Sequence, residues 1–293
     1  MLLTFIPGWI CLFSYLVSAA VLQSISSPIL QVPPENFTFV EGFANASISS
    51  TRNASLLNAT GVNDIRCHGT LYGFNPNVDD CMSAINYVQK SWQFVPFAER
   101  QPRPRQGVIS LPIRLMGDKA LCYFQPILQV GATVGTASFN EIRLAANALL
   151  SQCAKNQGQG GIATGIGGDG NLALILGTYS PNIQCYGTLH KWPSCREIMT
   201  TMDVTSTNVI FGPRLDPRTQ VSLPDTLSSS DNKCFATIGG NLDSSTWYRM
   251  WEALTALYAV CGRHIQGGKF KGLGDTGQLS MSLSGSLNSI VAA

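Results

Sequence analysis

Apolar residues recur at helical spacing in two segments of the chain, each of which ends at a cysteine. In the segment before Cys153 they are Phe139, Ile142, Ala146, Leu149 and Leu150. Counted back from Cys261, the same positions hold Trp247, Met250, Leu254, Leu257 and Tyr258. This periodicity predicts two amphipathic helices with buried faces. Ser138, followed three residues later by Glu141, predicts a capping box at the start of the first helix.

The two predicted helices belong to a longer repeat. The heptapeptide IRCHGTL at 65–71 returns as IQCYGTL at 183–189, and ISLP at 109–112 returns as VSLP at 221–224. Glycines of 160–170 return without a gap in 267–277, and four cysteines keep their order in each copy. A duplicated segment that cysteines hold together indicates architecture more directly than it indicates catalysis.

Each copy predicts three strands and two helices. The first strand carries the first cysteine, the second carries the third cysteine, and the last follows a glycine-rich turn. Their residues are 65–71, 120–125 and 171–176 in the first copy and 183–189, 233–238 and 278–283 in the second. A helix starts at the second cysteine, with Asp79-Asp80 as its cap in the first copy and Ser194 before it in the second. Loops rich in Pro and Arg, 97–107 and 211–220, follow that helix.

The predicted fold class is α+β, with two tandem β-α-β-α-β disulfide-pinned sandwich modules, 64–177 and 183–284, and a tail at 285–293. Helices would cover one face of a mostly antiparallel sheet in each module. Because the linker 177–182 is short, we expect the modules to pack against each other. The seam between them is the default location for a binding groove.

The N-terminus has the form of a secretory signal peptide. Residues 1–20 are apolar and end in Ser18-Ala19-Ala20, although no Lys or Arg precedes the apolar run. An uncleaved membrane anchor is the alternative, but Pro7-Gly8 and the small residues at the end favour cleavage. We therefore expect a secreted, extracellular protein with no stable membrane insertion after signal cleavage.

Cysteine usage agrees with export. The chain has nine cysteines, and Cys11 would leave with the signal peptide. The remaining eight form an even set, four in each copy, which is typical of disulfides in an oxidising compartment. Zinc sites usually use closer cysteine pairs with nearby histidines, so no metal site is predicted. Four cysteines allow three connectivities in each copy.

Residues 21–63 are rich in Ser, Asn and Thr and predict a flexible glycosylated leader. Four acceptor sequons lie within it, at Asn36, Asn45, Asn53 and Asn58. In an exported chain each is a candidate N-glycan site on exposed backbone. The simplest interpretation is that these sugars are incidental to function.

Composition and motifs argue against several classes of function but do not assign one. Only 12% of the 293 residues are charged and the net charge is +2, so no nucleic-acid partner is predicted. Residues 165–170 match the dinucleotide pattern G-x-G-x-x-G, but a following strand favours a turn, so no cofactor is predicted. No G-x-S-x-G or H-E-x-x-H motif occurs, and we nominate no catalytic residue.

Histidines and arginines offer weaker candidates. His68 and His264 each follow a cysteine closely and more plausibly hold structural hydrogen bonds than act as bases; His190 has no equivalent in the first copy. The loop arginines make a basic cluster, formed by Arg100, Arg103, Arg105 and Arg114 with Arg214 and Arg218 in the second copy. Contact with an acidic glycan or a partner is one interpretation, centred on Arg103, Arg105, Arg214 and Arg218. A solvated loop is the other.

The order Ile-x-Cys-x-Gly, helix, strand, helix ending in Cys, glycine turn and Gly-x-Leu strand resembles the small killer toxins of smut fungi and related secreted necrosis-inducing effectors. The quoted motifs are 65–69, 151–153 and 170–172, then 183–187, 260–262 and 277–279. More closely, the chain is similar to uncharacterised secreted fungal proteins. These toxins are smaller, single-module and richer in cysteine, so channel-blocking activity is not carried over. The resemblance implies an α/β sandwich and the cysteine pairs Cys67–Cys153, Cys185–Cys261, Cys81–Cys122 and Cys195–Cys234.

Three functions are compatible with these patterns. The first is a secreted non-catalytic effector or toxin-like protein that binds an extracellular protein or glycan. The second is a secreted enzyme acting on carbohydrate or a secondary metabolite, with its site between the modules. The third is a structural cell-wall glycoprotein. A cleft with two buried carboxylates, or a histidine–carboxylate pair, would favour the enzyme.

Overall fold

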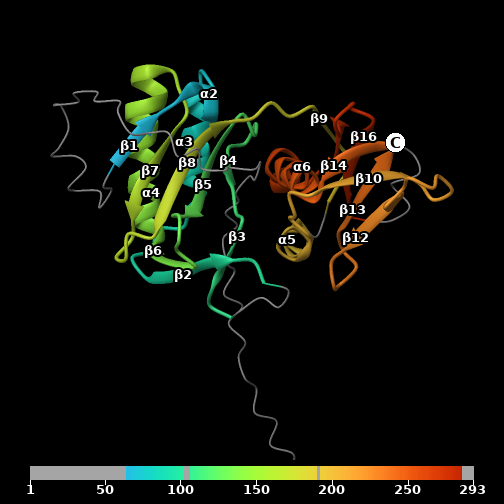
Figure 1. Ribbon diagram of the computed structural model, residues 1–293, viewed down its shortest axis with the longest axis horizontal. Helices are drawn as coiled ribbons and strands as arrows, with labels where there is room; N and C mark the ends of the chain where they lie inside the picture. Colours follow the sequence, from blue (N-terminus) through green and yellow to red (C-terminus); the bar gives the residue numbers. More distant parts are fainter. Residues whose placement is uncertain (1–63, 102–105, 190–191, 286–293) are drawn as a thin grey trace, which may run out of the picture.

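The computed structural model describes residues 64–101, 106–189 and 192–285 (Figure 1). Several expectations fall outside these ranges: the signal peptide, the leader, nearly all of the tail, and the residues Asn36, Asn45, Asn53, Asn58, Arg103, Arg105 and His190. We call the part from 64 to 178 the first repeat and the part from 183 to 285 the second repeat.

The first repeat contains eight strands, three α-helices and a short π-helix. In chain order they are β1 (Asp64–Cys67), α2 (Gly69–Tyr72), α3 (Val78–Asn86), β2 (Phe94–Glu99), β3 (Ile109–Leu111), β4 (Leu115–Met116), β5 (Cys122–Leu128), β6 (Val134–Ser138), α4 (Phe139–Leu149), the π-helix (Leu150–Lys155), β7 (Gly161–Ile166) and β8 (Leu172–Thr178).

The second repeat follows the same course. Its elements are β9 (Ile183–Tyr186), α5 (Trp192–Thr201), β10 (Asn208–Pro213), β11 (Val221–Leu223), β12 (Asp225–Ser228), β13 (Phe235–Gly240), β14 (Asp243–Thr246), α6 (Trp247–Val260), a 3-10 turn (Gly262–His264), β15 (Gly267–Leu273) and β16 (Leu279–Ser284).

Each repeat forms two sheets with the same strand order. The larger sheet is antiparallel and runs β1-β7-β8-β5-β4 in the first repeat and β9-β15-β16-β13-β12 in the second. The smaller sheet runs β3-β2-β6 and β11-β10-β14, with its first pair parallel. The mixed α+β class is therefore confirmed. A single five-element sandwich is too simple a description, because the prediction omitted the smaller sheet.

The omitted strands have a physical explanation. β2 contains Pro96 and precedes a loop rich in Pro and Arg, so it looks like part of that loop in the sequence. Its partner β6 begins at Val134, far along the chain, and short-range patterns do not report such a pairing. The segment 161–166, expected as part of a glycine turn, is strand β7.

The capping box of α4 is confirmed. Ser138 accepts a hydrogen bond from the N–H of Glu141, whose carboxylate accepts from the Ser138 N–H at 2.7 Å. The predicted apolar faces of α4 and α6 are buried, with Trp247 partly so. The cap of α3 differs from the prediction: Asn77 caps the helix, and Asp79 and Asp80 lie in its first turn.

The layers alternate between helices and sheets (Figure 1). Helices α3 and α4 pack with the first large sheet around one core. A second core joins α5 and α6 to the second large sheet and also contains Tyr123, Ile175 and Met116 of the first repeat. The first large sheet is thus covered on both faces, by its own helices and by those of the second repeat. The repeats pack against each other, as the short linker predicts, and they do so head to tail, with the helices of the second on the sheet of the first.

Four disulfides link the elements within the repeats. Cys67 bonds Cys153 and Cys81 bonds Cys122 in the first repeat; Cys185 bonds Cys261 and Cys195 bonds Cys234 in the second. These are the pairs that the resemblance implies. The first pair of each repeat joins the edge strand to the end of the long helix, and the second joins the short helix to the sheet.

The glycine motif lies between antiparallel strands in both repeats. Gly165, Gly167 and Gly170 have positive φ, as do their equivalents Gly272, Gly274 and Gly277. A Cβ on Gly167 would lie 2.1 Å from the carbonyl oxygen of Thr136, so the backbone approach requires glycine. A bulge at Thr164–Ile166 precedes the turn. The predicted turn feeding the last strand is confirmed.

Candidate functional site

Arg114 lies in the seam between the repeats, where its side chain is almost wholly buried. Its guanidinium contacts the carboxylate of Glu252 on α6 and donates to the Tyr248 hydroxyl at 3.3 Å. It also donates to Gln125 and lies 3.8 Å from the ring centre of Tyr123. Burial opposes the charge, but Glu252 and the tyrosines outweigh it and raise the pKa of Arg114. Arg114 is therefore not part of a surface basic cluster, which corrects that expectation.

Two further arginines cross the seam from opposite sides. Arg100 donates to the carbonyl of Met202 at 2.8 Å, and burial lowers its pKa to about 10. Arg263 donates to the carbonyl of Met116 at 2.8 Å and stacks on the ring of Tyr87. Charge-assisted bonds of this kind are stronger than neutral ones. Together with the shared core they fix the two repeats against each other.

A groove of about 420 Å³ opens at this seam. Its lining residues come from both repeats: Glu99, Leu111, Pro112, Ile127 and Leu128 from the first, and Val204, Thr205, Ser206, Thr207 and Tyr248 from the second. The volume falls within the range of roughly 300–1,000 Å³ typical of small-molecule sites. A groove therefore lies between the repeats, at the location expected from the sequence, and we name it the seam groove.

The two walls of the seam groove differ in chemistry. The first repeat supplies an apolar wall and one carboxylate, Glu99, for which no hydrogen bond is found among the described residues. Burial raises the pKa of Glu99. The second repeat supplies hydroxyl groups along residues 205–207. Asp203 holds this segment in place, since its carboxylate accepts from the N–H groups of Val204 and Thr205.

The seam groove is not duplicated. The positions equivalent to Glu99, Ile127 and Leu128 in the second repeat hold Pro213, Gly239 and Gly240. The carboxylate and much of the apolar wall are therefore lost there. The two repeats share a scaffold, but only the first carries the carboxylate with the full apolar wall. The groove is therefore not a by-product of the shared fold.

A second pocket, of about 440 Å³, lies beside α3. It is lined by Asp79, Met82, Ser83, Asn86, Tyr87 and Asp118. The Asp118 carboxylate accepts from Ser83 at 2.5 Å and Tyr87 at 2.6 Å, and lies 4.0 Å from His264. Burial opposes its ionisation, but these hydrogen bonds and nearby Arg263 and His264 lower its pKa. Because Ser83 donates to the carboxylate and not to the histidine, this is not the arrangement of a serine nucleophile.

The second repeat explains why Ser83 and Asp118 are bonded. There the helix carries the carboxylate, Glu197, and the turn carries the hydroxyl, Ser230, which donates at 2.9 Å. The donor and the acceptor have exchanged places between helix and turn. A tie that survives such an exchange serves structure, so the Ser83–Asp118 bond needs no catalytic explanation.

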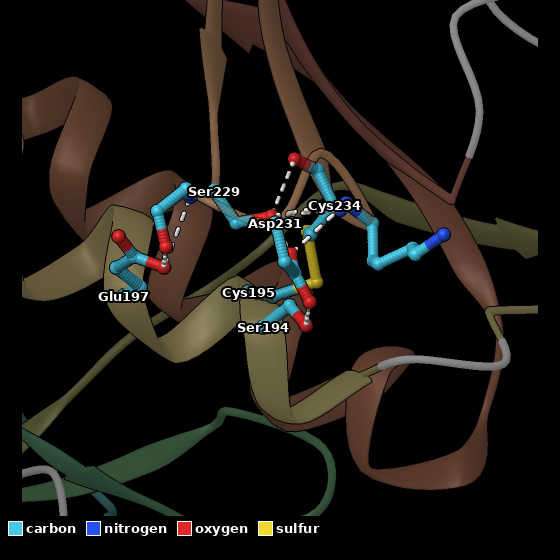
Figure 2. Close-up of a disulfide and its surroundings, with 8 residues drawn as sticks. Ser194, Cys195, Glu197, Ser229, Asp231 and Cys234 are labelled. Carbon is cyan, nitrogen blue, oxygen red and sulfur yellow. Dashed lines mark hydrogen bonds between the residues drawn. A yellow bond between two sulfur atoms is a disulfide. The ribbon is translucent and has the colours of Figure 1, made fainter. Parts of the chain in front are cut away.

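A second tie lies beside the disulfide that joins the short helix to the sheet, and its carboxylate is on the helix in one repeat and in the turn in the other. In the first repeat Asp80 on α3 accepts from the N–H groups of Lys119 and Leu121 in the turn and from that of Cys122 at the start of β5. In the second repeat Ser194 on α5 donates at 2.7 Å to Asp231 in the turn, next to the Cys195–Cys234 bond (Figure 2). In each repeat a hydrogen-bonded carboxylate thus joins the helix to the turn before the third cysteine. The carboxylate belongs to the helix in the first repeat and to the turn in the second.

The remaining predicted residues lie apart from the seam groove. His68 is partly buried and its Nδ1 lies 2.9 Å from the Thr70 hydroxyl, in keeping with the structural interpretation. Arg214 is exposed, and Arg218 pairs with Asp216 at 2.8 Å. These bonds lower the pKa of Asp216 to about 2.

Neither a family model nor a curated protein matches this chain. Within the described ranges, no helix is long and apolar enough to cross a membrane. The same residues contain no group of three or more His, Cys, Asp or Glu side chains that could hold a metal ion.

Sequence reasoning located the seam but missed Glu99, Ile127 and residues 204–207. They come from separate segments whose convergence depends on how the repeats pack. One signal was present in the sequence. Aligned by their cysteines and phenylalanines, the repeats differ at Glu99 and Pro213, and at Ile127 and Gly239.

Proposed function

We propose that this protein is a secreted, glycosylated, non-catalytic binding protein of the effector or toxin-like class, which recognises an extracellular protein or glycan. The observation that carries the proposal is the seam groove, a site built jointly by the two repeats and absent from the equivalent surface of the second. Four disulfides support an oxidising compartment.

The geometry favours binding over catalysis. Among the described residues, Glu99 is the one carboxylate that lines the seam groove, whereas glycoside hydrolysis by the common mechanisms uses two facing carboxylates. The ion pair, the arginine contacts and the shared core hold the two repeats together, and a site formed before its ligand arrives loses less entropy on binding.

The proposal is tested by applying the purified protein to plant tissue and to competing microbes. We expect a response, such as necrosis or growth inhibition, that disappears when Thr207→Trp fills the groove. Ser222→Trp, at an exposed position on β11, is the matched control and should keep the response. An inert wild-type protein, or a response that Thr207→Trp leaves intact, contradicts the proposal.

A secreted enzyme is the second candidate, and the observation that favours it is the Asp118–His264 pair beside α3, which is separate from the structural Ser83–Asp118 bond. That pocket is lined by the carboxylates Asp79 and Asp118, and His264 lies 4.0 Å from Asp118. Turnover of a carbohydrate or secondary metabolite that Asp118→Asn abolishes while the protein stays folded would establish this function in place of the first.

A further inference from the structure

The seam groove combines features that select one chemical class of ligand. One wall is apolar, formed by Leu111, Ile127 and Leu128. The opposite wall carries hydroxyl groups on Ser206 and Thr207, for which no hydrogen bond is found among the described residues. A ligand that fills this groove must present an apolar surface on one side and hydrogen-bonding groups on the other.

The polar groups of the groove can all form hydrogen bonds with a neutral ligand. Glu99 is an acceptor, while hydroxyl groups both donate and accept. Sugar hydroxyls can serve each of these groups, and the C–H face of a pyranose ring can cover the apolar wall. Arg100, next to Glu99 in sequence, directs its guanidinium to carbonyls of Met202 and Pro112.

We propose that the seam groove binds a short segment of a neutral glycan, with Glu99, Ser206 and Thr207 as hydrogen-bonding groups opposite the apolar wall. This inference rests on the proposed function and names the ligand class of the same site. Among the described residues the site occurs once, because the second repeat lacks its carboxylate and much of its apolar wall.

The experiment is isothermal titration with four neutral hexasaccharides: chitohexaose, laminarihexaose, cellohexaose and xylohexaose. We expect saturable binding of at least one, with a stoichiometry of one for each chain. Glu99→Ala and Thr207→Trp should each weaken it at least tenfold. A site built to bond hydroxyl groups loses affinity steeply when its polar partners are removed. Asp79→Asn, in the pocket beside α3, is the matched carboxylate control and should bind like the wild type.

Two measurements separate a neutral glycan from a cationic ligand. Glu99→Gln keeps an acceptor without the charge, so it should retain binding that Glu99→Ala loses. Affinity should also stay constant between 50 and 500 mM salt (chosen to span strong screening), because only charge–charge attraction is screened. Melting temperatures no lower than that of the wild type show that lost binding is not lost folding.

Failure of this inference is distinguishable from failure of the proposed function. If none of the four glycans binds but Thr207→Trp still abolishes the response in tissue or microbes, the glycan assignment is wrong and the binding function stands. Glycan binding that Glu99→Ala and Thr207→Trp leave unchanged also overturns the assignment. If neither glycan binding nor a response is found, both proposals fail.

Discussion

Arg114 and Glu252 form an ion pair across the seam, one from each repeat. The arginine is 2% exposed, and its guanidinium also meets Tyr248 and the ring of Tyr123. A charge buried to this degree is tolerated only while its partner is present. Because Glu252 belongs to the second repeat, the first repeat needs the second for the stable burial of Arg114.

We expect Glu252→Ala to destabilise the protein by about 3–5 kcal/mol, since it leaves the guanidinium of Arg114 buried without its counter-charge. The double variant Arg114→Leu, Glu252→Leu should recover most of that loss, because apolar side chains suit the surrounding core. Urea unfolding of the three proteins measures both effects. A single variant that loses less than about 1 kcal/mol would show that the seam admits water.

The exchanged ties can be tested by transplanting one arrangement into the other repeat. Glu197→Ala should cost about 1 kcal/mol, the usual contribution of such a hydrogen bond. The double variant Glu197→Ser, Ser230→Asp reproduces the order found at Ser83 and Asp118 and should restore stability. Chemical unfolding provides the comparison; a double variant no better than the single would mean that the two turns are not interchangeable.

Asn232 has a left-handed backbone conformation, φ 52°, two residues before Cys234, and Ala120 has φ 51° at the equivalent place before Cys122. A β-branched side chain is strained there, whereas Gly is not. We expect Asn232→Val to destabilise the protein by about 1–2 kcal/mol and Asn232→Gly to be neutral within about 0.5 kcal/mol. Equal melting temperatures for the two variants would contradict the assigned conformation.

Stability should depend on pH through Asp243. Burial opposes ionisation of this carboxylate, but the N–H groups of Gln278 and Thr276 outweigh it and lower its pKa below the ordinary value of 3.8. The unfolded chain then takes up the proton first as the pH falls. The contribution of Asp243 is thus complete above its unfolded pKa and is lost as the pH falls through its folded pKa.

The matched measurement is the free energy of unfolding of the wild type and Asp243→Asn in acid. The stability advantage of the wild type should shrink as the pH falls below 3.8. Glu99→Gln is a control of opposite sign, because burial raises the pKa of Glu99 and its ionisation opposes folding. That variant should gain on the wild type as the pH rises through the carboxyl range. Parallel curves for either variant would rule out the assigned shift.

What could be predicted from the sequence was local or repeated. The cap of α4 depends on Ser138 and Glu141, three residues apart, and the glycine turn recurs with its φ signs intact. Both arise from neighbouring atoms, which periodicity and spacing report. The repeat also acted as a control, since a motif present twice on equivalent turns needs no cofactor to explain it.

What escaped prediction depends on distant packing. Arg114 lies in a sequence rich in arginine and proline, where exposure is the normal expectation, yet Glu252 lies 138 residues away and buries it. The seam groove is formed in the same way, because Glu99 and Thr207 line one groove only when the two repeats pack together. Neither residue has a local pattern that marks it.

Because the repeats pack head to tail, their order along the chain cannot be exchanged without loss of core packing. Ile162 and Ile175 of the first large sheet pack toward α6, whereas the equivalent residues of the second sheet are Lys269 and Ser282. A chain permuted so that the second repeat came first and docked in the same way would set an ammonium group and a hydroxyl against that helix, and would leave two isoleucines without cover. The two repeats therefore have different roles: the sheet of the first accepts the helices of the second, and the sheet of the second is not suited to accept a further repeat. Neither repeat can replace the other.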